Sequence, residues 1–391
     1  MLAQTLRRKC MKEHELGKTM QLPWFICAPM GSAIAGLLVM AIAGCAVTQQ
    51  APQKPIDVLA FPSPPEPARF IFERSIYSSA DVVRDDGKTE FRRLVTGENK
   101  VGEGLSKPYG IAVRRGRVYI TDTVRRVVMV FDFPQGSYRE IGAQGEGGLR
   151  LPLGVDVDAA GNVYVSDGIT HRISVYDADG KFLRHLGSPE VLKRPAGIAV
   201  DATGARVYAV DMGGIDSMDH GVRVFDATTG AHLSSIGKRG DGQGEFNLPR
   251  DVAVGKDGLL YIVDGGNFRV QVMRPDGGFV RSFGAVGRQG GQFSRPKELA
   301  IDSTGNVYVV DAAFGNFQIF TQEGKLLLDV GGRSNTDGPA KYMLPSGIAV
   351  DEDGRVYLID QFFRKVDIFR PAELHPSAGF LGSAVRPIRA P

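Results

Sequence analysis

The chain has 391 residues, of which 43% are hydrophobic and 23% charged, so it is long enough to bury a sizeable core. The formal net charge of +3 is confined to the first 44 residues, which hold five Lys/Arg and two Asp/Glu. Residues 45–391 carry no net charge and so lack the excess positive charge that draws proteins to nucleic acids or anionic membranes. We therefore expect no nucleic-acid partner.

Residues 1–44 have the features of a signal peptide. The basic cluster Arg7–Lys9 precedes an apolar run of 14 residues at 31–44, a length that fits a signal-peptide core and is short for a transmembrane helix. The run leads into the sequence IAGC at residues 42–45, which resembles the lipobox of bacterial lipoproteins. This resemblance implies cleavage before Cys45 and lipidation of its thiol. The alternative is an uncleaved anchor helix that begins near Leu22.

Cysteine usage agrees with export followed by lipidation. The three cysteines are Cys10, Cys27 and Cys45, so only Cys45 would remain after cleavage and no disulfide could form. The lipoprotein resemblance implies a protein of the bacterial cell envelope that contacts the membrane through a lipid on Cys45. Ala46 follows in place of the aspartate that marks inner-membrane retention, which favours the periplasmic face of the outer membrane.

Residues 45–68 contain six prolines between Pro52 and Pro67, which is typical of a semi-rigid tether. Residues 69–106 follow as a predicted closing strand and connector. The sequence RFIFERSI, at 69–76, is the first choice for that strand, and EFRRLVTG, at 90–97, is the rival. We expect the segment that does not close the ring to form a short helix or a loop.

From Lys107 to Pro371 the chain repeats itself six times. In each repeat a tyrosine is followed three residues later by an aspartate, and successive repeats begin at prolines 43 to 54 residues apart. The pairs are Tyr119/Asp122, Tyr164/Asp167, Tyr208/Asp211, Tyr261/Asp264, Tyr308/Asp311 and Tyr357/Asp360. A period of this length is typical of the four-stranded blade of a β-propeller. The last repeat has only three strands, so we expect an N-terminal strand to complete it and close the ring. Residues 372–391 form a C-terminal tail.

These repeats resemble the NHL repeat, and with the lipobox the whole chain resembles bacterial NHL-repeat lipoproteins. The resemblance covers 107–371 and implies an all-β, six-bladed propeller that serves as a binding platform. We expect a monomer, because a closed ring has no strand edge that needs a second copy. The six aspartates invite comparison with a cation-binding ring of carboxylates. We expect instead that they accept hydrogen bonds from the amides of the following turn.

Histidines and carboxylates give only a weak case for a metal or an enzyme. His171 and His220 occupy equivalent loop positions in adjacent repeats, near Asp216 and Asp219, and these four could bind Zn²⁺. The NHL-related amidating lyase uses histidines around a zinc, whereas no inner strand here contains a histidine. Lactonase-type propellers hold Ca²⁺ in the channel, and only Asp251 and Glu298 resemble such ligands. We therefore expect no cofactor, with Zn²⁺ or Ca²⁺ as the alternatives.

The better candidate site lies at the channel mouth of the fourth and fifth repeats. Four repeats begin with Pro-x-Gly, but these two begin with Pro249-Arg250-Asp251 and Pro296-Lys297-Glu298. Loops on the same side present aromatic residues, namely Phe268, Phe314, Phe362 and Phe363. Aromatic groups beside charges favour a patch for a protein, peptide or cell-wall component. In the alternative interpretation, the phenylalanines fill gaps between blades and the charges form surface ion pairs.

The sequence therefore favours a non-catalytic interaction module, anchored in the envelope, that binds its partner on one propeller face. A metal-dependent lyase or hydrolase, with its site at the channel mouth, is the alternative function.

Overall fold

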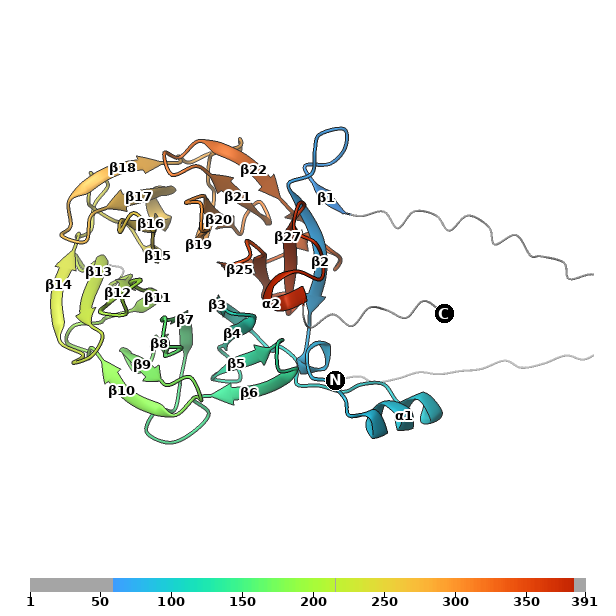
Figure 1. Ribbon diagram of the computed structural model, residues 1–391. Helices are drawn as coiled ribbons and strands as arrows, with labels where there is room; N and C mark the ends of the chain where they lie inside the picture. Colours follow the sequence, from blue (N-terminus) through green and yellow to red (C-terminus); the bar gives the residue numbers. More distant parts are fainter. Residues whose placement is uncertain (1–58, 215, 383–391) are drawn as a thin grey trace, which may run out of the picture. The chain divides into compact units, whose positions relative to one another are not determined.

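The computed structural model describes residues 59–214 and 216–382, which form a six-bladed β-propeller (Figure 1). Five blades are four-stranded antiparallel sheets and the sixth has five strands. In each blade the first strand lies at the channel and the last at the rim, as Figure 1 shows. The six-bladed ring predicted from the repeats is confirmed.

The strand bounds follow the repeats. Blades 1 to 3 consist of β3 (Pro108–Arg114), β4 (Arg117–Asp122), β5 (Val127–Asp132), β6 (Ser137–Ile141); β7 (Pro152–Val157), β8 (Val163–Asp167), β9 (Arg172–Tyr176), β10 (Phe182–Leu186); β11 (Pro195–Val200), β12 (Arg206–Asp211), β13 (Gly221–Asp226) and β14 (His232–Ile236). Blades 4 to 6 consist of β15 (Pro249–Val254), β16 (Leu260–Asp264), β17 (Arg269–Met273), β18 (Phe279–Phe283); β19 (Pro296–Ile301), β20 (Val307–Asp311), β21 (Asn316–Phe320), β22 (Leu326–Val330); β25 (Pro345–Val350), β26 (Val356–Asp360) and β27 (Lys365–Pro371), completed by N-terminal strands.

The core consists of hydrophobic clusters between neighbouring blades. The second strand of every blade is almost fully buried, because a blade is covered by another blade on each face. Each cluster joins residues of two adjacent blades, as when Val118 of blade 1 packs with Ile359 of blade 6. The fold is therefore held together by contacts that run around the ring.

The repeated aspartates anchor one end of each second strand, and in four repeats the tyrosine anchors the other end. Asp122 accepts from the amides of Ser106 and Lys107 through Oδ2, and from those of Val124 and Arg125 through Oδ1. All six aspartates are fully buried. Five of them accept from backbone amides of the following turn, as expected, whereas Asp264 accepts from the side chains of Asn267 and Arg269 instead. The six aspartates also fix the loop that leads into the first strand, which the sequence did not indicate.

At the other end of the strand, the tyrosine hydroxyl donates to a turn aspartate in four repeats. The pairs are Tyr164 to Asp158, Tyr261 to Asp257, Tyr308 to Asp302 and Tyr357 to Asp351. In these four repeats the two residues of the pair thus hold the chain on both faces of the propeller.

The glycine of Pro-x-Gly is required by the close approach of the first strands around the channel. A Cβ on Gly110 would lie 2.5 Å from the carbonyl oxygen of Leu153 in the next blade. A Cβ on Gly154 would lie 2.6 Å from the carbonyl oxygen of Ala196. Asp251 occupies this position in blade 4, and its carboxylate fits against Gly197, where a Cβ would lie 1.9 Å from Oδ1.

The ring is closed by the first of the two predicted segments. Strand β2 (Phe70–Ile76) pairs antiparallel with β27, and β1 (Ala60–Phe61) pairs with β2. The rival segment forms helix α1 (Gly87–Thr96), which has no buried residue. The last part of the segment predicted as a tether, residues 59–68, therefore contributes β1 to the sheet. Residues 1–58, including Cys45 and the predicted signal peptide, lie outside the described residues.

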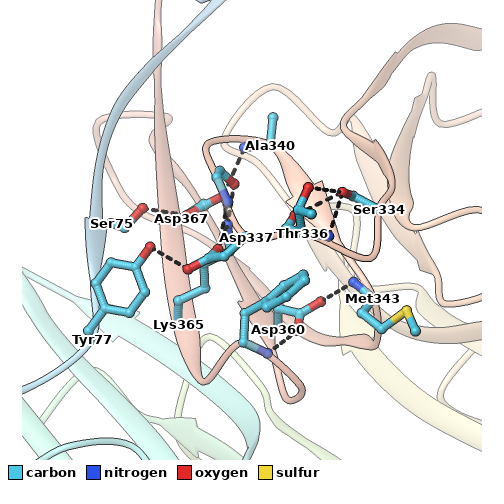
Figure 2. Close-up of polar contacts among 12 residues, drawn as sticks. Ser75, Tyr77, Ser334, Thr336, Asp337, Ala340, Met343, Asp360, Lys365 and Asp367 are labelled. Carbon is cyan, nitrogen blue, oxygen red and sulfur yellow. Dashed lines mark hydrogen bonds and ion pairs between the residues drawn. The ribbon is translucent and has the colours of Figure 1, made fainter. Parts of the chain in front are cut away.

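A buried polar network joins the closing strand to blade 6 (Figure 2). The Nζ of Lys365, at the start of β27, lies 3.0 Å from Asp367 Oδ2 and 3.2 Å from Asp337 Oδ1. Two residues from the N-terminal side complete it: the Ser75 hydroxyl donates to Asp367 and the Tyr77 hydroxyl to Asp337. The segment that contains Ser75 and Tyr77 is thus joined to blade 6 through the carboxylates of Asp367 and Asp337.

Short elements complete the fold: the 3₁₀ helices η1 (Ser79–Asp81) and η2 (Gly265–Asn267), the parallel pair β23 (Gly332–Arg333) and β24 (Lys341–Tyr342), and helix α2 (Gly379–Gly382). Within the described residues, no helix has the length and apolar character needed to cross a membrane.

Candidate functional site

The two faces of the propeller differ in the loops they present. We call the face on which the first strands begin the proline face; it also holds the loops after the second strands and the connectors between blades. The opposite face, with the tight turns after the first and third strands, is the turn face. All eight predicted ligand-binding residues belong to segments at the proline-face end of their strands or loops.

The channel encloses a cavity of about 200 Å³ lined by the first strands of all six blades. Its walls are mostly Ala, Val, Leu and Ile side chains, but three carboxylic acids also line it: Asp156, Asp251 and Glu298. The residues that directly follow the prolines, such as Arg250 and Lys297, do not line it. The two predicted carboxylates and the two predicted cations therefore have different surroundings.

Each channel carboxylate accepts hydrogen bonds from backbone amides. Asp251 Oδ2 lies 2.9 Å from the amide nitrogen of Leu299 in blade 5. Asp156 accepts from its neighbour Val157 at 2.7 Å and from Val200 of blade 3 at 2.8 Å. The carboxylates thus link adjacent blades around the channel.

Burial in the channel favours the protonated acids. It raises the pKa of Asp251 to about 7 and that of Asp156 to about 6, against the opposing effect of the amide donors. The pKa of Glu298 also rises well above its usual value, first through burial and then through the negative charge of Asp251. The channel therefore holds acids that keep their protons closer to neutral pH than exposed carboxyls do.

Arg250 and Lys297 lie at the mouth without a carboxylate partner. The Nη1 of Arg250 lies 3.4 Å from the sulfur of Met212, and among the described residues neither cation forms an ion pair. Burial lowers the pKa of Lys297 to about 8, and the charges of Arg250 and Arg295 act in the same direction. The interpretation of Arg250 and Lys297 as members of surface ion pairs thus finds no such pair here.

Tyr109, which the sequence analysis did not single out, also belongs to the mouth. It follows Pro108 in blade 1, yet its pKa is raised to about 12 by burial, by Glu298 and by Asp251, with Arg250 opposing. A side chain from blade 1 is therefore within electrostatic reach of residues in blades 4 and 5. An aromatic residue at this position of the repeat was the available signal.

Only one of the four phenylalanines predicted to form an aromatic patch is exposed. Phe268, Phe314 and Phe363 are half-buried, and Phe268 packs against the core between blades 4 and 5. Phe362 is 57% exposed. Further exposed apolar side chains on proline-face loops are aliphatic and were missed for that reason: Val124, Ile169, Met218 and Val286. The face thus presents scattered apolar side chains around the cationic mouth.

The predicted zinc ligands have other surroundings. His220 is buried, accepts from the Leu248 amide at Nδ1 and lies 3.2 Å from the Gly214 oxygen at Nε2, so both ring nitrogens have partners. Asp216 and Asp219 are exposed, and His171 is half-buried. Across residues 59–214 and 216–382, no three His, Cys, Asp or Glu side chains are grouped so that they could hold a metal ion.

Asp156 is the channel residue that sequence reasoning missed. It stands four residues after the proline of blade 2, where the other five repeats have alanine: Ala112, Ala199, Ala253, Ala300 and Ala349. A position-by-position comparison of the repeats would have found it.

Comparison with known proteins agrees with the fold. The model of the NHL repeat matches residues 246–273, which span most of blade 4. The chain is a six-bladed β-propeller with an NHL repeat. A protein of unknown function from Bacteroides thetaiotaomicron is similar to this propeller, with 17% identity and a TM-score of 0.56 over 77% of this chain and 75% of that one.

Two enzymes share the fold of this NHL-type propeller. A gluconolactonase from Xanthomonas campestris has 16% identity and a TM-score of 0.52, covering 77% of this chain and 98% of its own. A streptogramin B lyase has 14% identity and a TM-score of 0.50, covering 68% of this chain and 94% of its own. At such identities the likeness concerns the fold, which hosts both binding and catalysis.

Proposed function

We propose that this NHL-type propeller is a non-catalytic interaction module of the bacterial cell envelope, held by a lipid on Cys45, that binds a protein or cell-wall component on its proline face. The observation that supports it is the mouth itself, where Arg250 and Lys297 are half-buried and lack a carboxylate partner. A half-buried cation without an anion gains from a partner that supplies one, and Arg and apolar side chains are favoured in protein interfaces.

The test is capture of partners from the native envelope by the purified protein. Reversing both charges, with Arg250→Glu and Lys297→Glu, should reduce capture at least about tenfold, because like charges across an interface repel. The matched control reverses two exposed lysines of the turn face, Lys256→Glu and Lys325→Glu. Equal capture by the mouth variant and the control, with unchanged thermal unfolding, would contradict the proposal.

The proposed anchor has a test of its own. Replacing Cys45 with serine removes the thiol that the lipid would modify, so the variant should leave the membrane fraction and appear in the soluble fraction. Metabolic labelling with a fatty acid should mark the natural protein and not the variant. A Cys45→Ser protein that still sediments with membranes would favour the uncleaved anchor helix.

A metal-dependent lyase or hydrolase is the second candidate, because two enzymes share this fold. Three carboxyl groups line the channel, but within the described residues they are not grouped closely enough to hold an ion by themselves. It requires stoichiometric zinc or calcium in the purified protein and an activity that is lost with the metal. Asp251→Asn and Glu298→Gln would then remove both metal and activity.

A further inference from the structure

We propose that the mouth recognises carboxylate groups of an acidic protein segment, docked over Arg250, Lys297 and the adjoining sector of the proline face. The inference rests on the proposed binding function and names the chemistry of the partner. Its basis is geometric: cations without counter-charges, an uneven distribution of charge on the face, and exposed apolar side chains beside them.

The cations at the mouth lack the partners that half-buried charges normally have. Within the described residues Lys297 has no hydrogen bond or ion pair, and the only polar contact of the Arg250 side chain is with the sulfur of Met212. Two other half-buried arginines do have a polar partner: Arg269 pairs with Asp264 at 2.9 Å, and Arg184 donates to the carbonyl oxygen of Ala227 at 3.0 Å. Because removing a cation from water without an anion is costly, an incoming anion would stabilise the pair.

Positive charge on the proline face is concentrated in one sector. The segments 284–295, 331–344, 361–364 and 123–126, which belong to blades 5, 6 and 1, contain seven Lys/Arg and one Asp. That aspartate, Asp337, is already paired with Lys365. Of the cations, Arg125 is already paired with Glu140 and with Glu103 of the connector into blade 1. Arg250 and Lys297 extend this sector toward the channel.

The other sector of the face is balanced. The segments 142–151, 187–194, 212–220 and 237–248 contain five Lys/Arg and six Asp/Glu. A flat anionic bilayer or a long polyanion would contact these carboxylates as well as the cations, and the carboxylates would repel it. A short acidic stretch of a protein can occupy the cationic sector alone, which is why a protein segment fits better than a membrane.

Apolar contacts are available beside the cations. Phe362 and Val286 are exposed within the cationic sector, and Met218 is exposed in a blade 3 loop. Below the mouth, burial raises the pKa of Asp251 to about 7 and that of Glu298 above its usual value, which weakens the repulsion of an incoming carboxylate by these acids. The matching segment therefore has acidic side chains interspersed with apolar ones.

The experiment uses two short peptides, acetylated and amidated at their ends, that alternate leucine with either glutamate or glutamine. The glutamate peptide should bind the natural protein at least about tenfold more tightly, equivalent to about 1.4 kcal/mol. Arg250→Gln with Lys297→Gln should abolish that difference, whereas Lys256→Gln with Lys325→Gln on the turn face should preserve it. Equal binding of the two peptides to the natural protein would overturn the inference.

Further arms separate the sources of negative charge. Phosphatidylglycerol vesicles should bind the protein no better than neutral vesicles. Inorganic phosphate should displace the glutamate peptide only at the ionic strength at which chloride also displaces it. Vesicle binding lost in the Arg250/Lys297 variant would assign the mouth to a membrane and overturn the protein segment. If envelope capture depends on these cations while the glutamate peptide fails to bind, the proposed function stands and this inference falls. If envelope capture does not depend on these cations and the glutamate peptide does not bind either, the proposed function is contradicted as well.

Discussion

At the scale of single residues, the channel is where this propeller departs from its own repeat. Small residues suit the crowded first strands, yet Asp251 and Glu298 replace a glycine, and Asp156 replaces an alanine. Each carboxyl offsets part of its desolvation by accepting an amide of the next blade, as Asp251 does from Leu299. Three such carboxyls in one cavity cost stability in their ionised form.

That cost predicts an unusual dependence of stability on pH. An acid whose pKa is higher in the folded than in the unfolded protein stays protonated up to a higher pH in the folded state. Ionisation therefore destabilises the fold as pH rises from the ordinary value of 3.8 for Asp251 to its folded value of about 7. Asp251→Asn should remove this loss. The variant should be more stable than the natural protein, on the order of 2 kcal/mol, above about pH 7, with the gain vanishing near pH 4.

Urea unfolding across this pH range measures the effect, and Glu298→Gln should act in the same direction because its pKa is also raised. The matched control is Asp179→Asn, an exposed carboxyl in a turn of the turn face, which should leave the profile unchanged. A natural protein whose stability rises between mildly acidic and neutral pH would contradict the raised pKa values.

At the scale of strands and loops, what repeats was predictable and what occurs once was not. The Tyr/Asp spacing predicted the blades because the aspartate anchors the strand in every repeat and the tyrosine does so in four, and the missing fourth strand of the last repeat predicted β2. The pairing of β1 was not predictable, since two residues in a proline-rich segment carry no strand pattern. The same reason applies to the site: Asp251 and Glu298 break a visible motif, whereas Tyr109 acquires its surroundings only from blades across the ring.

At the scale of the whole molecule, the fold is a circle of similar interfaces with one chemically distinct join. Between blades 6 and 1, Ile76 and Val82 from the N-terminal segment enter the cluster that also contains Val118 and Ile359. Beside it, Lys365 is fully buried and holds Asp367 and Asp337, which in turn accept from the Ser75 and Tyr77 hydroxyls (Figure 2). The join therefore depends on a buried charge as well as on strand pairing.

Removing that charge should loosen the ring as a unit. Lys365→Met leaves the Asp367 carboxylate buried without its cation, and breaking a buried ion pair in this way costs about 3–5 kcal/mol. Urea unfolding should show one transition at a lower midpoint, because every blade relies on its neighbours. Adding Asp367→Asn to Lys365→Met should recover much of the loss, since the unpaired carboxylate is gone, the amide oxygen can accept from the Ala340 amide and the NH2 group can donate to the Ser75 hydroxyl. A single variant within about 1 kcal/mol of the natural protein, the range of a surface pair, would show that strand pairing between β2 and β27 closes the ring without help from the lysine.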